Sequence, residues 1–173
     1  MTLLTSNPSK YEPFAAELAA LGLVLAAPPC PLPEVQADTL AEVAAAKARA
    51  AARVLSTAVV VDDAGLSLAA FPGFPGPMTG HALRTLGRRG LKALVADDDR
   101  AEMVCVLAWS DGVETRCFEG RAEGRLDPER SVVPGGPGPL ASWFVCPEGP
   151  LAHRARALAA LAAAQGRFQA DEP

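Results

Sequence analysis

Two adjacent carboxylates, Asp62 and Asp63, are the side chains of this sequence best suited to carry chemistry. They follow Thr57–Val61, a run of small and β-branched residues that predicts a strand buried on both faces. Like charges beside a core repel one another unless a cation lies between them, and paired carboxylates suit Mg²⁺, a hard cation that also takes waters and phosphates. A solvated turn at the end of the strand is the alternative interpretation, and the pair alone does not decide between the two.

A second group of polar residues stands near the start of the chain, where Thr5, Ser6 and Asn7 precede Pro8 and Lys10. Asn followed by Pro is typical of the start of a helix. Hydroxyls, backbone N–H groups, the helix dipole and one lysine would together hold an anionic phosphate. The spacing alone favours the alternative, an ordinary Asn cap with a solvated lysine, because such caps occur on many helices.

The strongest helix signal covers Thr39 to Leu55. Thr39 and Glu42 have the spacing of a capping box, and the following Ala, Lys and Arg residues have high helix propensity. Glu42 therefore has a structural explanation, and Lys47 fits a solvent-facing position. Either residue becomes functional only if this helix points toward Asp62 and Asp63.

Three further side chains are candidate ligand contacts. His153 and Arg154 open the last expected helix, where an imidazole and a guanidinium would meet an anion or a carbonyl oxygen, although such a pair is more often solvated. Trp143 would stack on a base, but alternation along a strand more often makes such an aromatic part of the core.

These residues are positioned by an alternation of strands and helices, which predicts an α/β fold around a mixed sheet. In such sheets ligands gather beyond the carboxyl ends of strands, which singles out residues 5–10 and 62–63. Strands are expected at 2–5, 23–27, 57–61 and 143–145, and a hairpin is expected at 102–109 and 113–118 with a two-residue Asp111-Gly112 turn. Helices are expected from Asn7 to 21 and over 39–55, 79–95 and 153–164, with a loop at 71–77.

Composition narrows the class of protein. The 173 residues carry a formal net charge of -4, which argues for one acidic domain over 1–173 and against a nucleic-acid partner, since duplex binders carry a basic face. Apolar stretches are too short to span a membrane. The four cysteines lack a C-x-x-C pair and a histidine at ligand spacing, which argues against structural zinc. No signal peptide is recognised, so a reducing cytoplasm is expected.

Taken together, these segments resemble the inosine triphosphate pyrophosphatases, the Ham1-like enzymes that hydrolyse non-canonical purine nucleoside triphosphates. The matching segments follow the family order: residues 5–10 with S/T-x-N-x-x-K, 32–36 with L-P-E-x-Q, 41–48 with x-E-I-A-x-x-K-A, 60–66 with V-x-E/D-D-S/T-G-L, 73–77 with G-x-P-G-P, 118–124 with F-x-G-x-x-x-G, and 153–158 with H-R-x-x-A-L.

The resemblance implies an elongated α/β domain, often a homodimer, in which Mg²⁺ and water convert a nucleoside triphosphate to monophosphate and pyrophosphate. Carried over by position, Asp63 is the main catalytic carboxylate, which binds metal or orients the water. Glu42 and Asp62 support Mg²⁺. The phosphates are contacted by Lys10, Lys47 and the segment Thr5, Ser6 and Asn7.

The sequence departs from the family where the base is recognised. The family has a G-F-G-Y/W-D-P loop, whereas residues 135–143 here lack both the Phe and the Asp, and the segment before His153 is shortened. A changed pocket alters discrimination between bases. Two alternatives therefore stand beside the purine reading: a pyrimidine-directed, Maf-like pyrophosphatase, with Trp143 taking over the stacking, or a nucleotide-binding relative with weak turnover.

Overall fold

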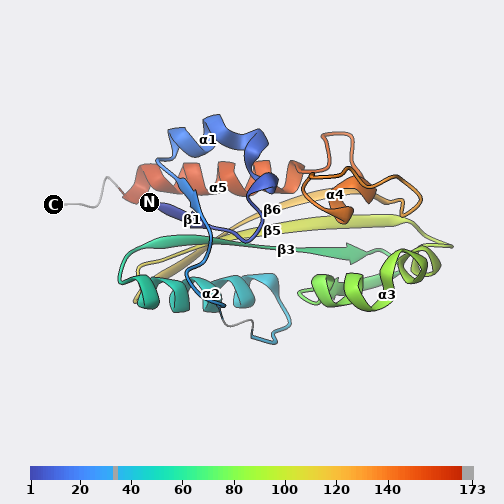
Figure 1. The fold of residues 1–173 in the computed structure, drawn as a ribbon, viewed down its shortest axis with the longest axis horizontal. Coiled ribbons are helices and arrows are strands. Elements are labelled where there is room, and N and C mark those ends of the chain that lie inside the picture. The colour runs from blue at the N-terminus through green and yellow to red at the C-terminus, as the bar shows by residue number, and fades with distance from the viewer. Residues whose placement is uncertain (33–34, 169–173) are drawn as a thin grey trace.

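The protein is described by a computed structural model that covers residues 1–32 and 35–168, so Pro33 and Glu34 of the L-P-E-x-Q segment lie outside the described residues. One mixed sheet runs the length of the molecule with helices on both of its faces (Figure 1). The predicted α/β class is therefore confirmed. In the described part of the chain, no helix is long and apolar enough to cross a bilayer.

The sheet has strand order β2-β1-β3-β5-β6-β7, with β4 paired to β3. β1 is parallel to β2 and to β3, and the remaining pairs are antiparallel. The strands are β1 (Thr2–Leu4), β2 (Val24–Ala26), β3 (Val59–Leu68), β4 (Phe71–Gly76), β5 (Arg100–Ser110), β6 (Thr115–Leu126) and β7 (Phe144–Val145).

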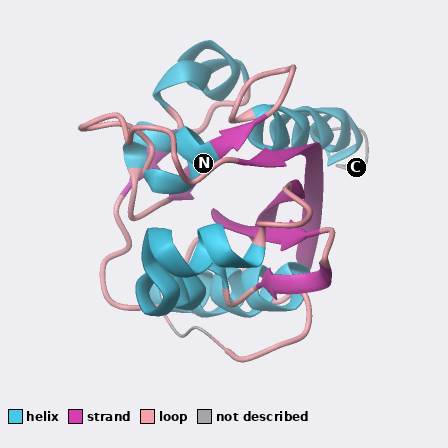
Figure 2. Cartoon of the chain, turned by 90° about the vertical axis from the view of Figure 1, so that its right-hand side faces the viewer, coloured by secondary structure: helices cyan, strands magenta, loops and turns pink. Residues whose placement is uncertain are grey.

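The helices form a layer on each side of the sheet, as Figures 1 and 2 show from two directions. α1 (Ala15–Ala20) and α5 (Ala152–Phe168) lie on one side, and α2 (Leu40–Leu55) and α3 (Thr79–Leu94) lie on the other. A short helix, α4 (Pro139–Trp143), precedes β7. The central strands are thus covered on both faces, which explains why β3 begins as an uninterrupted apolar run.

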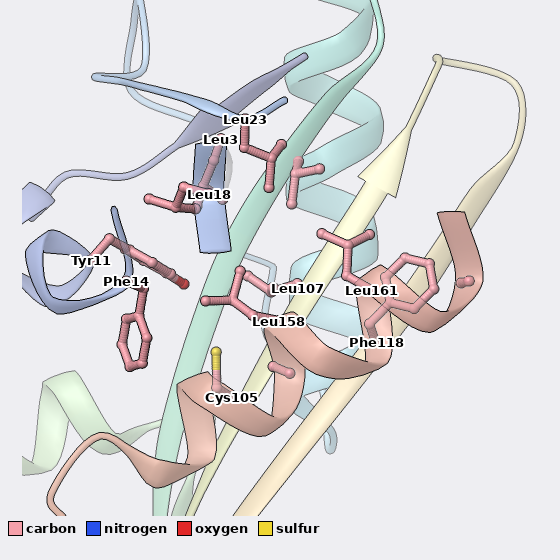
Figure 3. Close-up of a cluster of buried hydrophobic side chains, with 13 residues drawn as sticks. Leu3, Tyr11, Phe14, Leu18, Leu23, Cys105, Leu107, Phe118, Leu158 and Leu161 are labelled. Atoms are coloured by element: carbon pink, nitrogen blue, oxygen red, sulfur yellow. The ribbon is translucent and has the colours of Figure 1, made fainter. Parts of the chain in front are cut away.

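The core follows the alternation of side chains along β3. Val60 packs with Tyr11, Leu107 and Leu158 under α1 and α5, in the cluster drawn in Figure 3. Val59 and Val61 point the other way and pack against the alanine face of α2. Each fully buried aliphatic side chain contributes about 1.5–3 kcal/mol, so β3 is anchored from both sides before it reaches its carboxylates.

Gly120 marks the closest approach of α5 to the sheet. A Cβ built on this residue would lie 2.1 Å from the His153 carbonyl oxygen and 2.3 Å from the Ala157 nitrogen. A side chain would therefore have to push the first turns of α5 away from β6. This close approach gives the first glycine of the F-x-G-x-x-x-G segment a physical reason.

The helix predicted from Asn7 is instead broken into η1 (Pro8–Lys10), η2 (Glu12–Phe14) and α1. The break between η1 and η2 falls at Tyr11, two residues before Pro13, which has no N–H to donate and whose ring would clash with the carbonyl four residues earlier in a continuous helix. The Asn7 side chain makes no capping hydrogen bond. The prediction of one continuous helix with an Asn cap was therefore wrong.

Two turn predictions also differ from the structure. β5 and β6 are joined by a four-residue loop, residues 111–114, and not by the predicted two-residue turn. The Asp111 Oδ1 stabilises this wider loop, because it accepts hydrogen bonds from the Val113 N–H at 2.8 Å and the Glu114 N–H at 2.7 Å. The segment 71–77 was predicted to be a loop, but most of it forms β4, an edge strand. An edge strand tolerates proline because one side of its backbone needs no partner.

Candidate active site

A change of strand partner along β3 leaves one short stretch of its backbone without a neighbouring strand on one side. β1 pairs with β3 as far as Leu4 and Val61, and β4 pairs from Gly76 and Leu66 onward. Among the described residues, no strand pairs with 62–65 on this side, which we call the open edge, while β5 pairs with all of β3 on the other side. Ligands of α/β sheets collect at such switch points.

Asp62 and Asp63 occupy the open edge but lie on opposite faces of the sheet. β3 continues through them to Leu68, and they stand opposite Leu107 and Val106 of β5, which belong to different core clusters. Successive side chains of a strand point in opposite directions. The two carboxylates therefore have separate surroundings.

On the α2 face, the carboxylate of Asp63 meets Lys47. The Lys47 Nζ lies 3.3 Å from the Asp63 Oδ2, and the Ala64 N–H donates to the Asp63 Oδ1 at 3.0 Å. Burial raises the pKa of Asp63, and the lysine only partly opposes that shift. A partly buried carboxylate beside a cation suits the binding of a polar substrate.

On the α5 face, the carboxylate of Asp62 forms a buried ion pair with Arg154. The Arg154 Nη2 lies 3.5 Å from the Asp62 Oδ2, and the two side chains are only 4% and 7% exposed. The guanidinium also stands over the ring of Tyr11, with Cζ 5.8 Å from the centroid. Arg154 is thus fixed in the interior, in contrast to the solvated pair that the sequence favoured.

His153 holds Arg154 from the other side. The Arg154 Nη1 lies 2.6 Å from the His153 Nε2, and a guanidinium can only donate, so Nε2 accepts and the ring is neutral. Burial, with the positive charges of Arg154 and Lys10, lowers the pKa of His153 to about 3. The imidazole is therefore a hydrogen-bond acceptor at neutral pH.

The segment after β1 approaches the open edge from the end of that strand. Thr5 is buried and its Oγ1 accepts a hydrogen bond from the Asn7 N–H at 3.2 Å, while Ser6 is exposed. The Ser9 hydroxyl donates to the Asn7 Oδ1 at 2.6 Å and lies 3.3 Å from the Gly136 carbonyl oxygen. The candidate phosphate segment thus touches the loop in which this chain departs from the family.

Lys10 brings a cation to the same place. Burial lowers its pKa, and Asp62 is the largest of the charges that oppose this shift. The charge of Asp63 also raises the pKa of Lys10, by less than Asp62 does.

Glu42 is engaged in the predicted capping box, which is confirmed. The Glu42 N–H donates to the Thr39 Oγ1 at 3.2 Å, and the Thr39 N–H donates to the Glu42 Oε2 at 3.1 Å. Within residues 1–32 and 35–168, no group of three or more His, Cys, Asp or Glu side chains is arranged to hold a metal ion. Glu42, Asp62 and Asp63 are therefore not gathered around one point.

Trp143 lies in the core rather than in a pocket. Its side chain is buried with Leu126 and Phe144, and its indole N–H donates to the Arg130 carbonyl at 3.1 Å. The Arg88 guanidinium covers the ring at 5.4 Å from the centroid.

Gly65, at the end of the open edge, lies against the turn that closes β4. A Cβ on Gly65 would lie 2.5 Å from the Gly76 carbonyl oxygen. Thr79 locks this contact, because its hydroxyl donates to the Gly76 carbonyl at 2.6 Å and accepts the Leu66 N–H at 2.8 Å. The start of α3 is thereby fixed beside Asp63.

A cavity of about 340 Å³ opens on the Asp63 face, and two basic residues that motif analysis missed belong to its lining. His81 and Arg84 come from α3, and Gln36, Ala64 and Met78 complete much of the wall. Their position directly after the G-x-P-G-P segment was the available signal, since Thr79 ties that segment to β3.

Comparison with known proteins identifies relatives along most of the chain. The model of the Ham1 family matches residues 1–138. A dITP/XTP pyrophosphatase of Methanopyrus kandleri is 36% identical over 128 residues, which are 72% of this chain and 68% of the relative. An inosine triphosphate pyrophosphatase of Tuber melanosporum is 33% identical over 144 residues, or 81% and 78% of the two chains.

Solved structures agree with the fold. A HAM1 protein from Coxiella burnetii superposes with a TM-score of 0.73 over 96% of this chain and 98% of its own, at 22% identity. The family match ends at residue 138, in front of Trp143, His153 and Arg154. The family match therefore includes the open edge with Asp62 and Asp63, and it does not include the last helix.

Proposed function

This chain belongs to the Ham1 family, and from that premise we propose that it hydrolyses a non-canonical nucleoside triphosphate to the monophosphate and pyrophosphate. Its curated relatives are named for dITP and XTP or for inosine triphosphate. The observation that carries the proposal is the contact of Asp63 with Lys47 at the open edge, with Lys10 beside it. A carboxylate paired with one lysine and within electrostatic range of a second is an arrangement suited to a polyphosphate and an attacking water.

In the reaction, the oxygen of water forms a bond to the α-phosphorus and the bond from that phosphorus to the bridging oxygen breaks. Asp63 orients the water and accepts its hydrogen bond. Lys47 and Lys10 neutralise charge on the phosphate oxygens. The backbone N–H of Ser6 and the side-chain amide of Asn7 contact the outer phosphate oxygens, whereas the Thr5 N–H donates to the Ala26 carbonyl at 3.0 Å. Positioning and charge stabilisation supply most of the catalysis in such chemistry.

We propose Mg²⁺ as the cation and Asp63 as its protein ligand, because Mg²⁺ commonly uses one or two carboxylates and completes its shell with waters and phosphates. Glu42 is the second candidate ligand, and its carboxylate would have to give up its hydrogen bonds to Thr39 to bind the cation. When bound, Mg²⁺ neutralises phosphate charge and lowers the pKa of coordinated water. We assign Asp62 a different role, as the counter-ion of Arg154, because its carboxylate is nearly fully buried in that pair.

The altered loop leaves two candidates for the base that this enzyme prefers. Residues 135–138 touch Ser9 through Gly136, and the stacking side chain expected at Trp143 is occupied in the core. We propose a purine substrate, in line with the named relatives, and keep a pyrimidine substrate as the second candidate because of this loop.

A substrate panel tests both candidates. Purified protein is incubated with ITP, XTP, dUTP, UTP and methylated pyrimidine triphosphates in magnesium buffer, and pyrophosphate is measured directly. Preference for ITP and XTP supports the purine assignment, and preference for the pyrimidines replaces it. Calorimetric binding of a nucleotide without pyrophosphate release in any reaction would identify a binding protein and overturn the enzymatic proposal.

We also propose that the protein is a homodimer, as the resemblance implies, and that it works in the reducing cytoplasm that is expected from the sequence. Light scattering coupled to size-exclusion chromatography measures the mass in solution. A monomer of about 17.9 kDa at the concentrations used in the assay would contradict the dimer.

A further inference from the structure

The cavity beside Asp63 receives two basic side chains from the first turns of α3. His81 and Arg84 are three residues apart, and this spacing places them on one face of a helix. The Thr79 hydroxyl, which bonds to both Gly76 and Leu66, fixes the start of that helix beside the end of the open edge. Both side chains are exposed, and the His81 Nε2 lies 3.3 Å from the Thr85 hydroxyl, so the anchored helix positions them at the cavity while their ends stay accessible to a ligand.

The guanidinium of Arg84 lies back over the first turn of α3. A Cβ built on Gly80 would lie 3.4 Å from the Arg84 Nη1, and Gly80 is itself part of the cavity wall. Among the described residues, no carboxylate forms an ion pair with Arg84. Six other arginines each pair with a carboxylate: Arg100, Arg116, Arg121, Arg125, Arg154 and Arg156.

The charge of this cavity favours an anion. Its lining contains one carboxylate, that of Asp63, and this group already faces Lys47. The planar fork of an arginine matches two phosphate oxygens at once, and its bonds to phosphate are charge-assisted. The cavity also has room for a group larger than a single phosphate, at about 340 Å³.

We propose that Arg84, assisted by His81, binds the β- and γ-phosphates and holds the pyrophosphate that leaves. The inference rests on the proposed function. As the bond between the α-phosphorus and the bridging oxygen breaks, the electron pair stays on that oxygen, which becomes part of pyrophosphate, and one proton from the attacking water is released. Arg84 neutralises the charge that develops on the leaving group.

The test measures binding of inorganic pyrophosphate by calorimetry, which does not depend on turnover. Wild-type protein, Arg84→Gln and Arg89→Gln are titrated in the same magnesium buffer. Arg89 is an exposed arginine of α3 outside the cavity lining, so its variant matches the change in charge. Loss of a charge-assisted contact predicts an affinity about tenfold or more weaker for R84Q, and within twofold of wild type for R89Q.

Steady-state kinetics give the second readout. In R84Q, the inhibition constant of pyrophosphate and the KM for the triphosphate should rise by a similar factor. Equal pyrophosphate affinity in R84Q and R89Q, or no binding by the wild type at millimolar pyrophosphate, overturns the inference. If the wild type hydrolyses nucleotides while R84Q binds pyrophosphate normally, only the role of Arg84 fails. If the wild type hydrolyses none, the proposed function fails by itself.

Discussion

Asp62 and Asp63 are neighbours in the chain, yet their carboxylates are held on opposite faces of β3 by cations from different helices. Asp62 meets Arg154 of α5 at 3.5 Å, and Asp63 meets Lys47 of α2 at 3.3 Å. The first pair is almost completely buried, whereas the Asp63 of the second pair lines a cavity. One carboxylate is thus placed to hold the fold together and the other to meet a substrate.

The two carboxylates should respond differently to substitution by Asn. Asp63→Asn should reduce pyrophosphate release by about 100-fold or more, and its melting temperature should be unchanged or slightly raised. Burial raises the pKa of Asp63, which means that its ionised form opposes folding at neutral pH. Wild-type turnover in D63N would remove Asp63 from the mechanism.

Asp62→Asn should cost stability instead. The substitution leaves the Arg154 guanidinium buried without its counter-ion, at a cost of about 3 kcal/mol. For a chain of this size, that cost corresponds to a melting temperature lower by about 10 °C in calorimetry. A D62N protein as stable as the wild type would show that the buried ion pair contributes little.

Acid should destabilise the protein through His153. Burial lowers the pKa of His153 to about 3 in the folded protein, against an ordinary value of 6.5. Between these two pH values the imidazole is therefore protonated in the unfolded chain and neutral in the folded protein. Stability from this group is complete above pH 6.5 and falls as the pH drops from 6.5 toward 3, by up to about 1.4 kcal/mol per pH unit. Urea unfolding at pH 5 to 8 should give a shallower pH slope for His153→Gln, which keeps an acceptor for Arg154. An identical slope in both proteins would assign the acid sensitivity to other groups.

Gly120→Ala should destabilise the protein by separating β6 from α5. The new methyl group would lie 2.1 Å from the His153 carbonyl oxygen, so the helix must shift, at about 3 kcal/mol or more. Thermal unfolding should show a decrease of about 10 °C. Gly80→Ala is the matched control, because its nearest neighbour is the flexible end of Arg84 at 3.4 Å and Ala favours a helix. A small effect in G120A would mean that α5 tolerates displacement.

Trp143→Phe should change stability and leave base preference intact. The variant loses the hydrogen bond to the Arg130 carbonyl and some packing, for about 1–3 kcal/mol. The ratio of activities on ITP and dUTP should stay within twofold of the wild-type ratio. A tenfold change in that ratio would restore Trp143 as a base-stacking residue.

Local signals predicted much of the fold. The capping box of Thr39 and Glu42 started α2 where the sequence placed it, because its hydrogen bonds form within four residues. The broken N-terminal helix was missed because Pro13 outweighed the Asn7-Pro8 signal. β4 was missed because prolines suggest a loop unless the strand is known to lie at an edge.

The arrangement of the site could be predicted only once the strand pairing of the sheet was known. The predicted strand ended before Asp62 and Asp63, so both carboxylates were placed at one site. β5 extends β3 to Leu68, so strand alternation separates them instead. His81 and Arg84 carry no motif, and the bonds of Thr79 to Leu66 and Gly76, next to the open edge, help to bring α3 beside Asp63.

The open edge also separates two kinds of change that this enzyme can undergo. β5 pairs with β3 along its full length, so the backbone that presents Asp63 is hydrogen-bonded within the sheet although no described strand pairs with its other side. Residues 134–138 lie outside the sheet, and the Ser9 hydroxyl donates to the Gly136 carbonyl of this loop. We therefore expect changes in that loop to alter the preferred base without displacing Asp63.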